Sequence, residues 1–167
     1  MGIVERDFDC EEIHPIDIVE TLAEERSWDF DRVAEDQIAM AVEGTWRTYS
    51  VTLAWSAQDE SLRLICAFEM ASPTRRLGAL YKVMALANDR CWSGAFTLWT
   101  DQKMMAYRYS LNLAGGAIAS SAQINDMVRD SVLAAERFYP AFQLVAAGGE
   151  TPEKALGIAM TEAYGRA

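Results

Sequence analysis

The sequence has little of the chemistry that metal sites and nucleophilic catalysis require. Among its 167 residues there is one histidine, His14, and it stands beside Pro15, where a helix is expected to begin. A metal site needs several histidine, cysteine or carboxylate ligands that converge on one point. We therefore assign His14 a structural or solvated role and predict neither a metal ion nor a cofactor.

Cysteine is also scarce. Cys10, Cys66 and Cys91 are odd in number and show no C-x-x-C spacing, which suits a reducing compartment where thiols stay free. Cysteine–histidine catalysis would require His14 to meet Cys66 or Cys91 in space. Because Cys66 lies on the apolar face of an expected strand, we interpret it as a buried, inert core residue. Cys91 should lie nearer the surface, and it is the remaining candidate for a reactive thiol.

Three catalytic signatures are missing as well. The chain contains no G-x-S-x-G of serine hydrolases, no phosphate-binding G-x-x-x-x-G-K-[ST] and no dinucleotide-binding G-x-G-x-x-G. Acidic residues are plentiful, but they fall where solvated faces and turns are expected, so they do not indicate a paired acid and base. We predict that the protein is not an enzyme.

Basic residues are outnumbered, and long apolar runs are absent. Lys and Arg number 15 against 25 Asp and Glu, and the resulting net charge of −10 repels the phosphates of nucleic acids. The longest apolar runs, such as residues 113–119, fall short of the roughly 18 to 20 residues that span a bilayer. The first twelve residues carry no apolar segment typical of a secretory signal. We expect no nucleic acid partner, no membrane association and a cytoplasmic location.

What the sequence does contain is regular periodicity. A period of two predicts strands at residues 38–42, 48–55, 62–70, 95–100 and 104–113. Helical spacing predicts helices at residues 15–27, 73–89, 124–145 and 152–160. Ser72 is expected to cap the second helix, with Pro73 at its first position. A capping box from Ser120 to Gln123 precedes the third, and Pro140 is expected to kink or restart it.

These elements follow the order α-βββ-α-ββ-α-α. Hairpin-connected strands with one apolar face each are typical of an antiparallel sheet whose core side is covered by helices. The predicted fold class is α+β, a two-layer sandwich with the helices on one face of the sheet. No repeat and no linker divides the chain, so we expect a single domain over residues 1–167.

The segment NDRCWSGAFTLW, residues 88–99, has two interpretations. It is either a reactive thiol beside an aromatic shelf or a junction between a helix and a buried strand, and we favour the junction. In that interpretation Trp92 closes over the end of the core, while Phe96 and Leu98 face inward. Alternation then places Trp99 on the opposite face of the sheet.

The sheet face opposite the helices should display small, apolar and cationic side chains. By alternation they are Thr48, Ser50, Thr52, Arg63, Ile65, Ala67, Thr97, Trp99, Met104, Ala106 and Arg108. One interpretation is a solvated surface with scattered apolar residues. In the other, Trp99, Ile65 and Met104 form the apolar centre of a partner-binding surface. Arg63 and Arg108 then stand at its edge, because aromatic and arginine side chains often supply binding hot spots.

The second helix offers a further surface. Leu77, Tyr81 and Met84 follow one another on its apolar stripe. Either the stripe belongs entirely to the core, or it exceeds what one sheet can cover. In the second case these three residues form the interface of a homodimer.

Three segments carry a resemblance to a known family. They are YSVTLAWSAQDESLRLICAF, LYKVMALANDRCWSGAFTLWTDQKMMAYRYSL and, near the end, ERFYPAFQLVAAGGETPEKAL. In the second segment, Asn88, Gly94 and Phe96 stand where the family pattern places them. Through the order and spacing of these segments, the chain resembles the YbjN family of bacterial proteins, also described as sensory transduction regulators.

The resemblance implies a fold like that of type III secretion chaperones, with helices packed on a curved antiparallel sheet and a tendency to dimerise. It also implies a regulatory or chaperone-like protein that binds other polypeptides and has no established reaction. A small-molecule sensor with a pocket between sheet and helices is the alternative, and an enzyme is the third possibility.

Overall fold

The structure, a computed structural model, describes residues 13–164. Its helices are α1 (Pro15–Glu25), α2 (Leu77–Asn88), α3 (Ser121–Ala146) and α4 (Pro152–Tyr164). Its strands are β1 (Asp29–Ala34), β2 (Gln37–Glu43), β3 (Thr48–Ser56), β4 (Ser61–Glu69), β5 (Gly94–Trp99) and β6 (Met104–Asn112). Short 3₁₀ turns, η1 (Thr74–Arg76) and η2 (Ala114–Gly116), precede α2 and α3.

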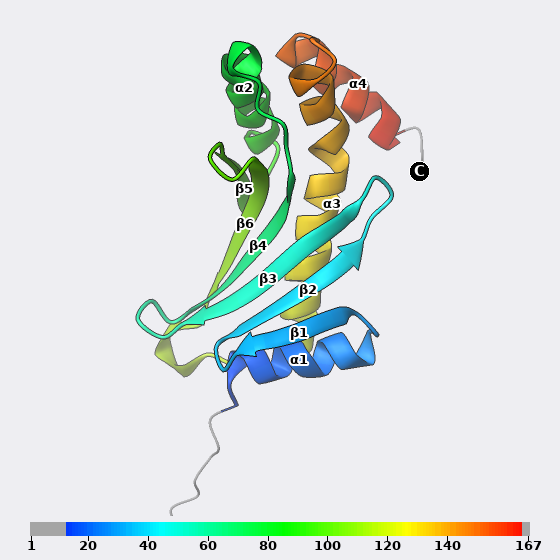
Figure 1. The fold of residues 1–167 in the computed structure, drawn as a ribbon. Helices are drawn as coiled ribbons and strands as arrows, with labels where there is room; N and C mark the ends of the chain where they lie inside the picture. The colour runs from blue at the N-terminus through cyan, green and yellow to red at the C-terminus, as the bar shows by residue number, and fades with distance from the viewer. Residues whose placement is uncertain (1–12, 165–167) are drawn as a thin grey trace, which may run out of the picture.

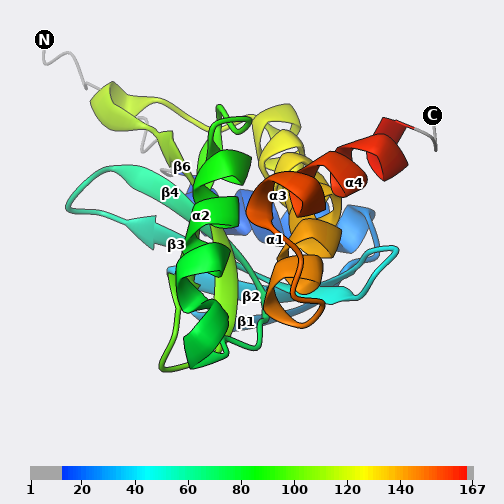
Figure 2. The ribbon, with the colours of Figure 1, turned by 90° about the horizontal axis from the view of Figure 1, so that it is seen from above.

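One antiparallel sheet carries the fold, with its strands in the order β1-β2-β3-β4-β6-β5. Helices pack on one face of it: α1 lies against β1, β2 and β3, α3 against β4 and β6, and α2 against β5 (Figure 1). The last helix, α4, packs against α2 and α3 (Figure 2). The predicted α+β class, with helices on one face of an antiparallel sheet, is confirmed.

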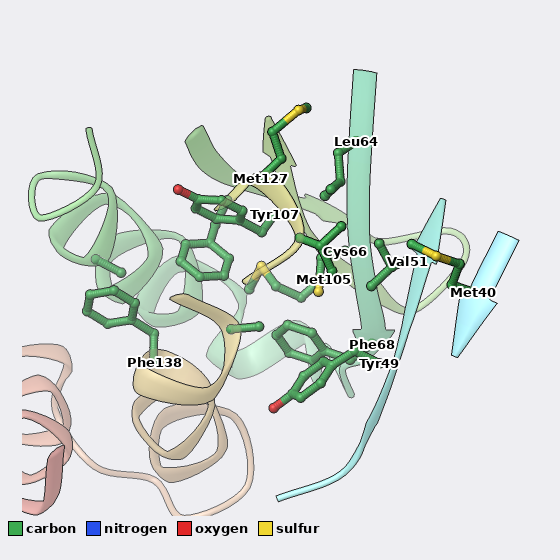
Figure 3. Close-up of a cluster of buried hydrophobic side chains, with 14 of the residues drawn as sticks. Met40, Tyr49, Val51, Leu64, Cys66, Phe68, Met105, Tyr107, Met127 and Phe138 are labelled. Carbon is green, nitrogen blue, oxygen red and sulfur yellow. The ribbon is translucent and has the colours of Figure 1, made fainter. Parts of the chain in front are cut away.

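The core lies between the sheet and these helices. Alternation puts Cys66 and Phe68 of β4 on the same side as Met105 and Tyr107 of β6, and Phe138 of α3 belongs to the same buried cluster (Figure 3). All five side chains are buried. Each large apolar side chain that leaves water contributes roughly 1.5–3 kcal/mol to folding, so the facing of these strands is strongly determined. The facing predicted for residues 62–70 and 104–113 is confirmed.

Strand β1 is not predicted from the sequence, so the observed order is α-ββββ-α-ββ-α-α. The partly buried positions of this strand hold Phe30 and Arg32, and a charged residue at such a position hides the apolar period of two. Arg32 pairs with α1 instead. Its Nη1 atom lies 2.6 Å from Asp17 Oδ1 and 2.8 Å from Glu20 Oε2. These ion pairs join α1 to the edge of the sheet.

Helix α2 begins later than predicted. Pro73 is extended, with ψ of 131°, and Ser72 does not cap the helix because its hydroxyl donates to the Met70 carbonyl oxygen at 3.3 Å. A 3₁₀ turn follows, and Arg76 donates from Nε to the Val145 carbonyl oxygen at 3.0 Å. That bond satisfies a carbonyl group at the end of α3. The start of α2 therefore depends on a contact with a distant helix.

Helix α3 stays helical through Pro140, so of the predicted kink or restart the restart is not observed. Phe138 and Phe142, on either side of Pro140, are fully buried, so packing holds both halves of the helix to the core. This packing outweighs the one backbone hydrogen bond that proline removes. The predicted capping box is confirmed, because Ser120 Oγ accepts from Gln123 N at 3.1 Å and Gln123 Oε1 accepts from Ser120 N at 2.9 Å.

Candidate functional site

The sheet face opposite the helices holds the residues predicted to bind a partner. Ile65 of β4 lies directly opposite Arg108 of β6, and Trp99 of β5 lies directly opposite Met104 of β6. One row of residues separates these two pairs. Arg63 stands two positions from Ile65 and therefore on the same face. The fold brings all five residues onto one face of three adjacent strands.

The row between the two pairs consists of small side chains. Ala67 lies opposite Ala106, and Ala106 lies opposite Thr97. Ala67 and Ala106 were expected to be displayed, but their exposed fractions are 9% and 0%. A methyl group between rows of longer side chains reaches less far from the sheet than they do, which explains its burial.

A hollow of about 920 Å³ opens over β4, β6 and β5 on this face, and we call it the sheet hollow. Arg63, Ile65, Trp99 and Arg108 line it, whereas Met104 does not. Four of the five predicted partner-binding residues thus border one concave surface.

Trp92 also lines the sheet hollow, and its expected position over the core is wrong. Its exposed fraction is 98%, so the side chain projects into solvent. Trp92 lies in the turn between α2 and β5, where neither helical nor strand periodicity applies. No local pattern therefore indicates which way its ring points.

The sheet hollow carries more positive than negative charge, although the whole chain has a net charge of −10. Arg63 forms an ion pair with Asp59, and both side chains are about half exposed. Arg108 is exposed and forms no ion pair with any residue in the range 13–164. One arginine is therefore compensated, and the other can pair with a ligand.

The residues that carry the family pattern hold β5 in place. Gly94 pairs with Tyr109, and a Cβ at Gly94 would lie only 2.3 Å from the Arg108 carbonyl oxygen. Only glycine allows so close an approach. On the other side of β5, Asn88 donates from Nδ2 to Phe96 O at 3.1 Å and accepts from Phe96 N at 2.7 Å. The Asn88 amide takes the place of a neighbouring strand at the middle of this edge.

Neither described cysteine is an activated nucleophile. Burial raises the pKa of the Cys66 thiol to about 12, and the negative charge of Glu136 adds to the rise. Burial also raises the pKa of Cys91, with Arg137 acting in the opposite direction. Because the thiolate is the reactive form, a raised pKa means that the protein environment activates neither thiol near pH 7. The prediction that Cys66 is buried and Cys91 lies nearer the surface is confirmed.

His14 has the predicted structural role. Its Nδ1 atom accepts a hydrogen bond from the Ile16 backbone N–H at 3.1 Å and caps α1. In the part of the chain that the structure describes, no three His, Cys, Asp or Glu side chains are grouped so as to hold a metal ion. No helix within residues 13–164 combines the length and apolar character that crossing a membrane requires.

A second hollow of about 490 Å³ lies between the β2–β3 turn and helices α3 and α4, and we call it the turn hollow. Glu136 of α3 lines it and holds the turn. Its carboxylate accepts from the backbone N–H groups of Thr45 at 2.8 Å and Trp46 at 3.1 Å. The Tyr49 hydroxyl donates to the same carboxylate at 2.5 Å. A Cβ at Gly44 would lie 2.3 Å from Glu136 Oε1, so a larger residue there would displace the Glu136 carboxylate.

The predicted dimer residues of α2 are only partly accessible. Tyr81 is 43% exposed, whereas Leu77 and Met84 are half-buried against the core. The core side of α2 is formed by Leu80 and Val83. The apolar stripe is therefore shared between core and surface, with Tyr81 as its most exposed member.

The chain matches one protein family over most of its length. The YbjN family, described as "Putative bacterial sensory transduction regulator", matches residues 15–144. The protein belongs to the YbjN family. The resemblance noted in the sequence is therefore confirmed. None of the curated proteins matches the sequence.

Two solved structures are similar to this chain. "Crystal structure of YbjN, a putative transcription regulator from E. coli" is 10% identical, with 90% of this chain and 92% of that chain covered at a TM-score of 0.51. A chain of the HopA1–SchA chaperone–effector complex is 14% identical, with 75% of this chain and 91% of that chain covered at a TM-score of 0.47. At these identities the YbjN likeness concerns the fold alone.

Proposed function

We propose that this YbjN-family protein is a non-enzymatic regulatory or chaperone-like module that binds another polypeptide. The observation that carries the proposal is the sheet hollow, where Trp92 and Trp99 border a face that the helices do not cover. Arg63 and Arg108 line the same hollow. Tryptophan and arginine are enriched among the residues that supply most of the binding energy at protein interfaces.

Two further features support this proposal. The raised pKa values of Cys66 and Cys91 weigh against a nucleophilic enzyme. Free thiols persist in a reducing compartment, which supports a cytoplasmic location.

Site-specific photo-crosslinking in the producing cell tests the proposal. A photoreactive residue at position 97 lies in the sheet hollow, and one at position 129 is exposed on α3, on the helix side of the molecule. We expect position 97, and not position 129, to crosslink to a different protein. Equal crosslinks from both positions, or none from position 97, would contradict polypeptide binding at this face.

Replacement of one tryptophan gives a quantitative test. Trp99→Ala is expected to leave the fold intact and to weaken partner binding by ~2 kcal/mol or more, because Trp99 lies on the open face and not in the core. Thermal melting checks the fold, and calorimetric titration with the crosslinked partner measures affinity. Thr48→Ala, on the same face but outside the hollow, is the matched control. If Trp99→Ala unfolds the protein or binds with unchanged affinity, the functional surface lies elsewhere, in the grooves around α1.

The turn hollow favours a second candidate function, a small-molecule sensor. Its volume of about 490 Å³ falls within the roughly 300–1,000 Å³ typical of ligand sites. The exposed Leu133 and the charged Arg137 line it. A rise in melting temperature with one metabolite, abolished by Leu133→Glu, would favour this function.

We also propose a homodimer formed through α2. Tyr81 is the exposed part of a stripe that continues into the half-buried Leu77 and Met84, and an aromatic side chain at such a place is typical of interfaces.

A further inference from the structure

We infer that the occupant of the sheet hollow is an acidic, partly apolar segment of a different polypeptide, which binds face-on with Arg108 paired to one of its carboxylates. This inference rests on the proposed polypeptide-binding function and specifies the partner's chemistry and its direction of approach.

The charges of the hollow favour an acidic segment. Asp59 already compensates Arg63, whereas Arg108 has no ion pair among residues 13–164. The residues directly opposite Arg108 on its two neighbouring strands are Ile65 and Ala95, both apolar. Neither neighbour offers a side-chain acceptor that would compete with a partner's carboxylate for the Arg108 guanidinium. Arginine also binds carboxylates through two parallel hydrogen bonds, which adds geometric specificity.

The apolar residues that line the sheet hollow indicate that the partner segment is apolar as well as acidic. Trp92 is 98% exposed, and Trp99 and Ile65 are partly exposed beside it in the same hollow. Tryptophan offers a large apolar surface together with one N–H donor, and it is enriched at interfaces for that reason. A segment that places an aliphatic or aromatic side chain beside its carboxylate would bury this surface, whereas a purely acidic segment would leave it in water.

The neighbouring strand edge is closed, which favours approach from the face. In an antiparallel strand, the N–H and C=O of one residue point to the same side. Both groups of Phe96 are taken by the Asn88 amide, at 2.7 and 3.1 Å. An added strand would therefore have to displace Asn88 from the middle of β5.

A second copy of this chain is a poor occupant. A symmetric dimer through this face would bring Arg63 and Arg108 of one copy near the same two arginines of the other. Each copy also carries a net charge of −10, so the approach is opposed by both local and overall repulsion. A short acidic segment brings fewer negative charges into this overall field than a second copy with a net charge of −10 does.

Peptide selection on the full-length protein tests the inference. Random twelve-residue peptides displayed on phage are selected for binding to the immobilised chain. We expect enrichment of peptides that combine Asp or Glu with aliphatic or aromatic residues. Arg108→Glu should weaken the enriched peptides at least tenfold. Arg129→Glu, the same charge change on α3, should leave their affinity within twofold.

A second variant separates binding from folding. Because Trp92 is 98% exposed, Trp92→Ala is not expected to disturb the fold, and it should weaken the same peptides at least tenfold. Binding by wild type should also weaken as salt rises, since salt screens exposed charges.

The outcomes distinguish the inference from the function on which it rests. If basic or uncharged peptides are enriched, or if Arg108→Glu binds the enriched peptides equally well, the inference that the partner is acidic is wrong. The proposed polypeptide-binding function is then not contradicted. No enrichment above the blank support contradicts both. Tighter binding to Asn88→Ala would show that strands are added at the β5 edge, which overturns the face-on approach. A synthetic peptide of residues 1–12 could also compete with the enriched peptides at micromolar concentration. That result would identify the chain's own acidic N-terminal segment as the occupant and contradict the inference that a different polypeptide binds there.

Discussion

At the scale of single residues, burial decides the chemistry of the two described cysteines. Cys66 is fully buried, whereas Cys91 is partly exposed and donates from Sγ to the Ala87 carbonyl oxygen at 3.3 Å. We expect a thiol reagent at neutral pH to modify Cys91 well before Cys66. Peptide mapping of the labelled native protein measures each rate separately, and it also separates Cys10, which lies outside the described residues. Equal rates at Cys66 and Cys91 would mean that the facing of β4 is wrong.

The same burial predicts how stability depends on pH. Folding raises the pKa of Cys66 from 9.0 to about 12 and that of Tyr107 from 10.0 to about 12, in both cases mainly by burial. In this range the folded state keeps a proton that the unfolded state has lost, so the contribution to stability is complete below about pH 9 and falls as the pH rises toward 12.

We therefore expect the free energy of unfolding to decrease from pH 9 upward. Cys66→Ala should flatten the start of this decrease, near pH 9, because the unfolded thiol ionises at lower pH than the unfolded tyrosine hydroxyl. Urea denaturation at a series of pH values measures it. An unchanged slope in Cys66→Ala would assign the pH dependence to other groups.

Glu136 joins elements that are far apart in the sequence. Its carboxylate accepts from two backbone N–H groups of the β2–β3 turn and from the Tyr49 hydroxyl. Burial, together with this last hydrogen bond, raises the pKa of Tyr49. Glu136→Gln removes the charge that strengthens these bonds, so we expect a loss of about 1–3 kcal/mol in unfolding free energy. Glu162→Gln, on α4 beside the same hollow, is the matched control. A loss no larger than that of the control would show that the turn does not depend on Glu136.

At the scale of elements, Asn88 protects the edge strand β5. Asn88→Ala would leave the Phe96 N–H and C=O without their partner, which costs about 1–3 kcal/mol for partly buried groups. It would also open an edge to which another chain can add. We expect lower stability and a mass that rises with protein concentration.

Two further variants make this prediction specific. Asn88→Asp keeps the acceptor for Phe96 N–H and loses the donor, so an intermediate effect is expected. Asn125→Ala, on α3, is the control. Light scattering and urea denaturation measure both quantities, and a stable, monodisperse Asn88→Ala protein would rule out edge protection.

Sequence periodicity predicts a helix or strand correctly where its inward positions are all apolar. It does not predict an element whose position depends on a contact with a residue far away in the sequence. The alternation of residues 62–70 predicts β4 and its facing, because every inward position is apolar. β1 escapes prediction because Arg32 occupies a partly buried position and is compensated by Asp17 and Glu20 of α1. The start of α2 depends in the same way on Arg76, which reaches α3.

The same distinction holds for the candidate site, where sequence periodicity predicts some residues and not others. The period of two suffices to place Trp99, Ile65 and Arg108 on one face. It does not predict that Trp92 joins them, because the α2–β5 turn has no period. Nor does it predict that Ala67 and Ala106, on the same face, are buried.

At the scale of the whole molecule, the two proposed surfaces do not overlap. The sheet hollow lies on the face away from the helices, whereas Tyr81 lies on α2, in the helical layer. A dimer through α2 would therefore leave both sheet hollows open, and each copy could hold a partner. The two kinds of contact differ in their electrostatics, because one joins opposite charges and the other joins two chains of net charge −10.

The dimer can be tested through this difference. We expect light scattering at micromolar concentration to give twice the 18.6 kDa of one chain. Because each copy carries ten excess negative charges, salt should screen the repulsion and strengthen the dimer, while it weakens an acidic peptide bound at Arg108. Tyr81→Glu should shift the mass to one chain without unfolding, since Tyr81 is 43% exposed and the core side of α2 is left intact. Arg129→Glu, which adds the same kind of charge on α3, should keep the dimer. If the wild-type protein has the mass of one chain at every salt concentration, the proposed homodimer is wrong. The exposure of the Tyr81 ring would then have to be explained in another way.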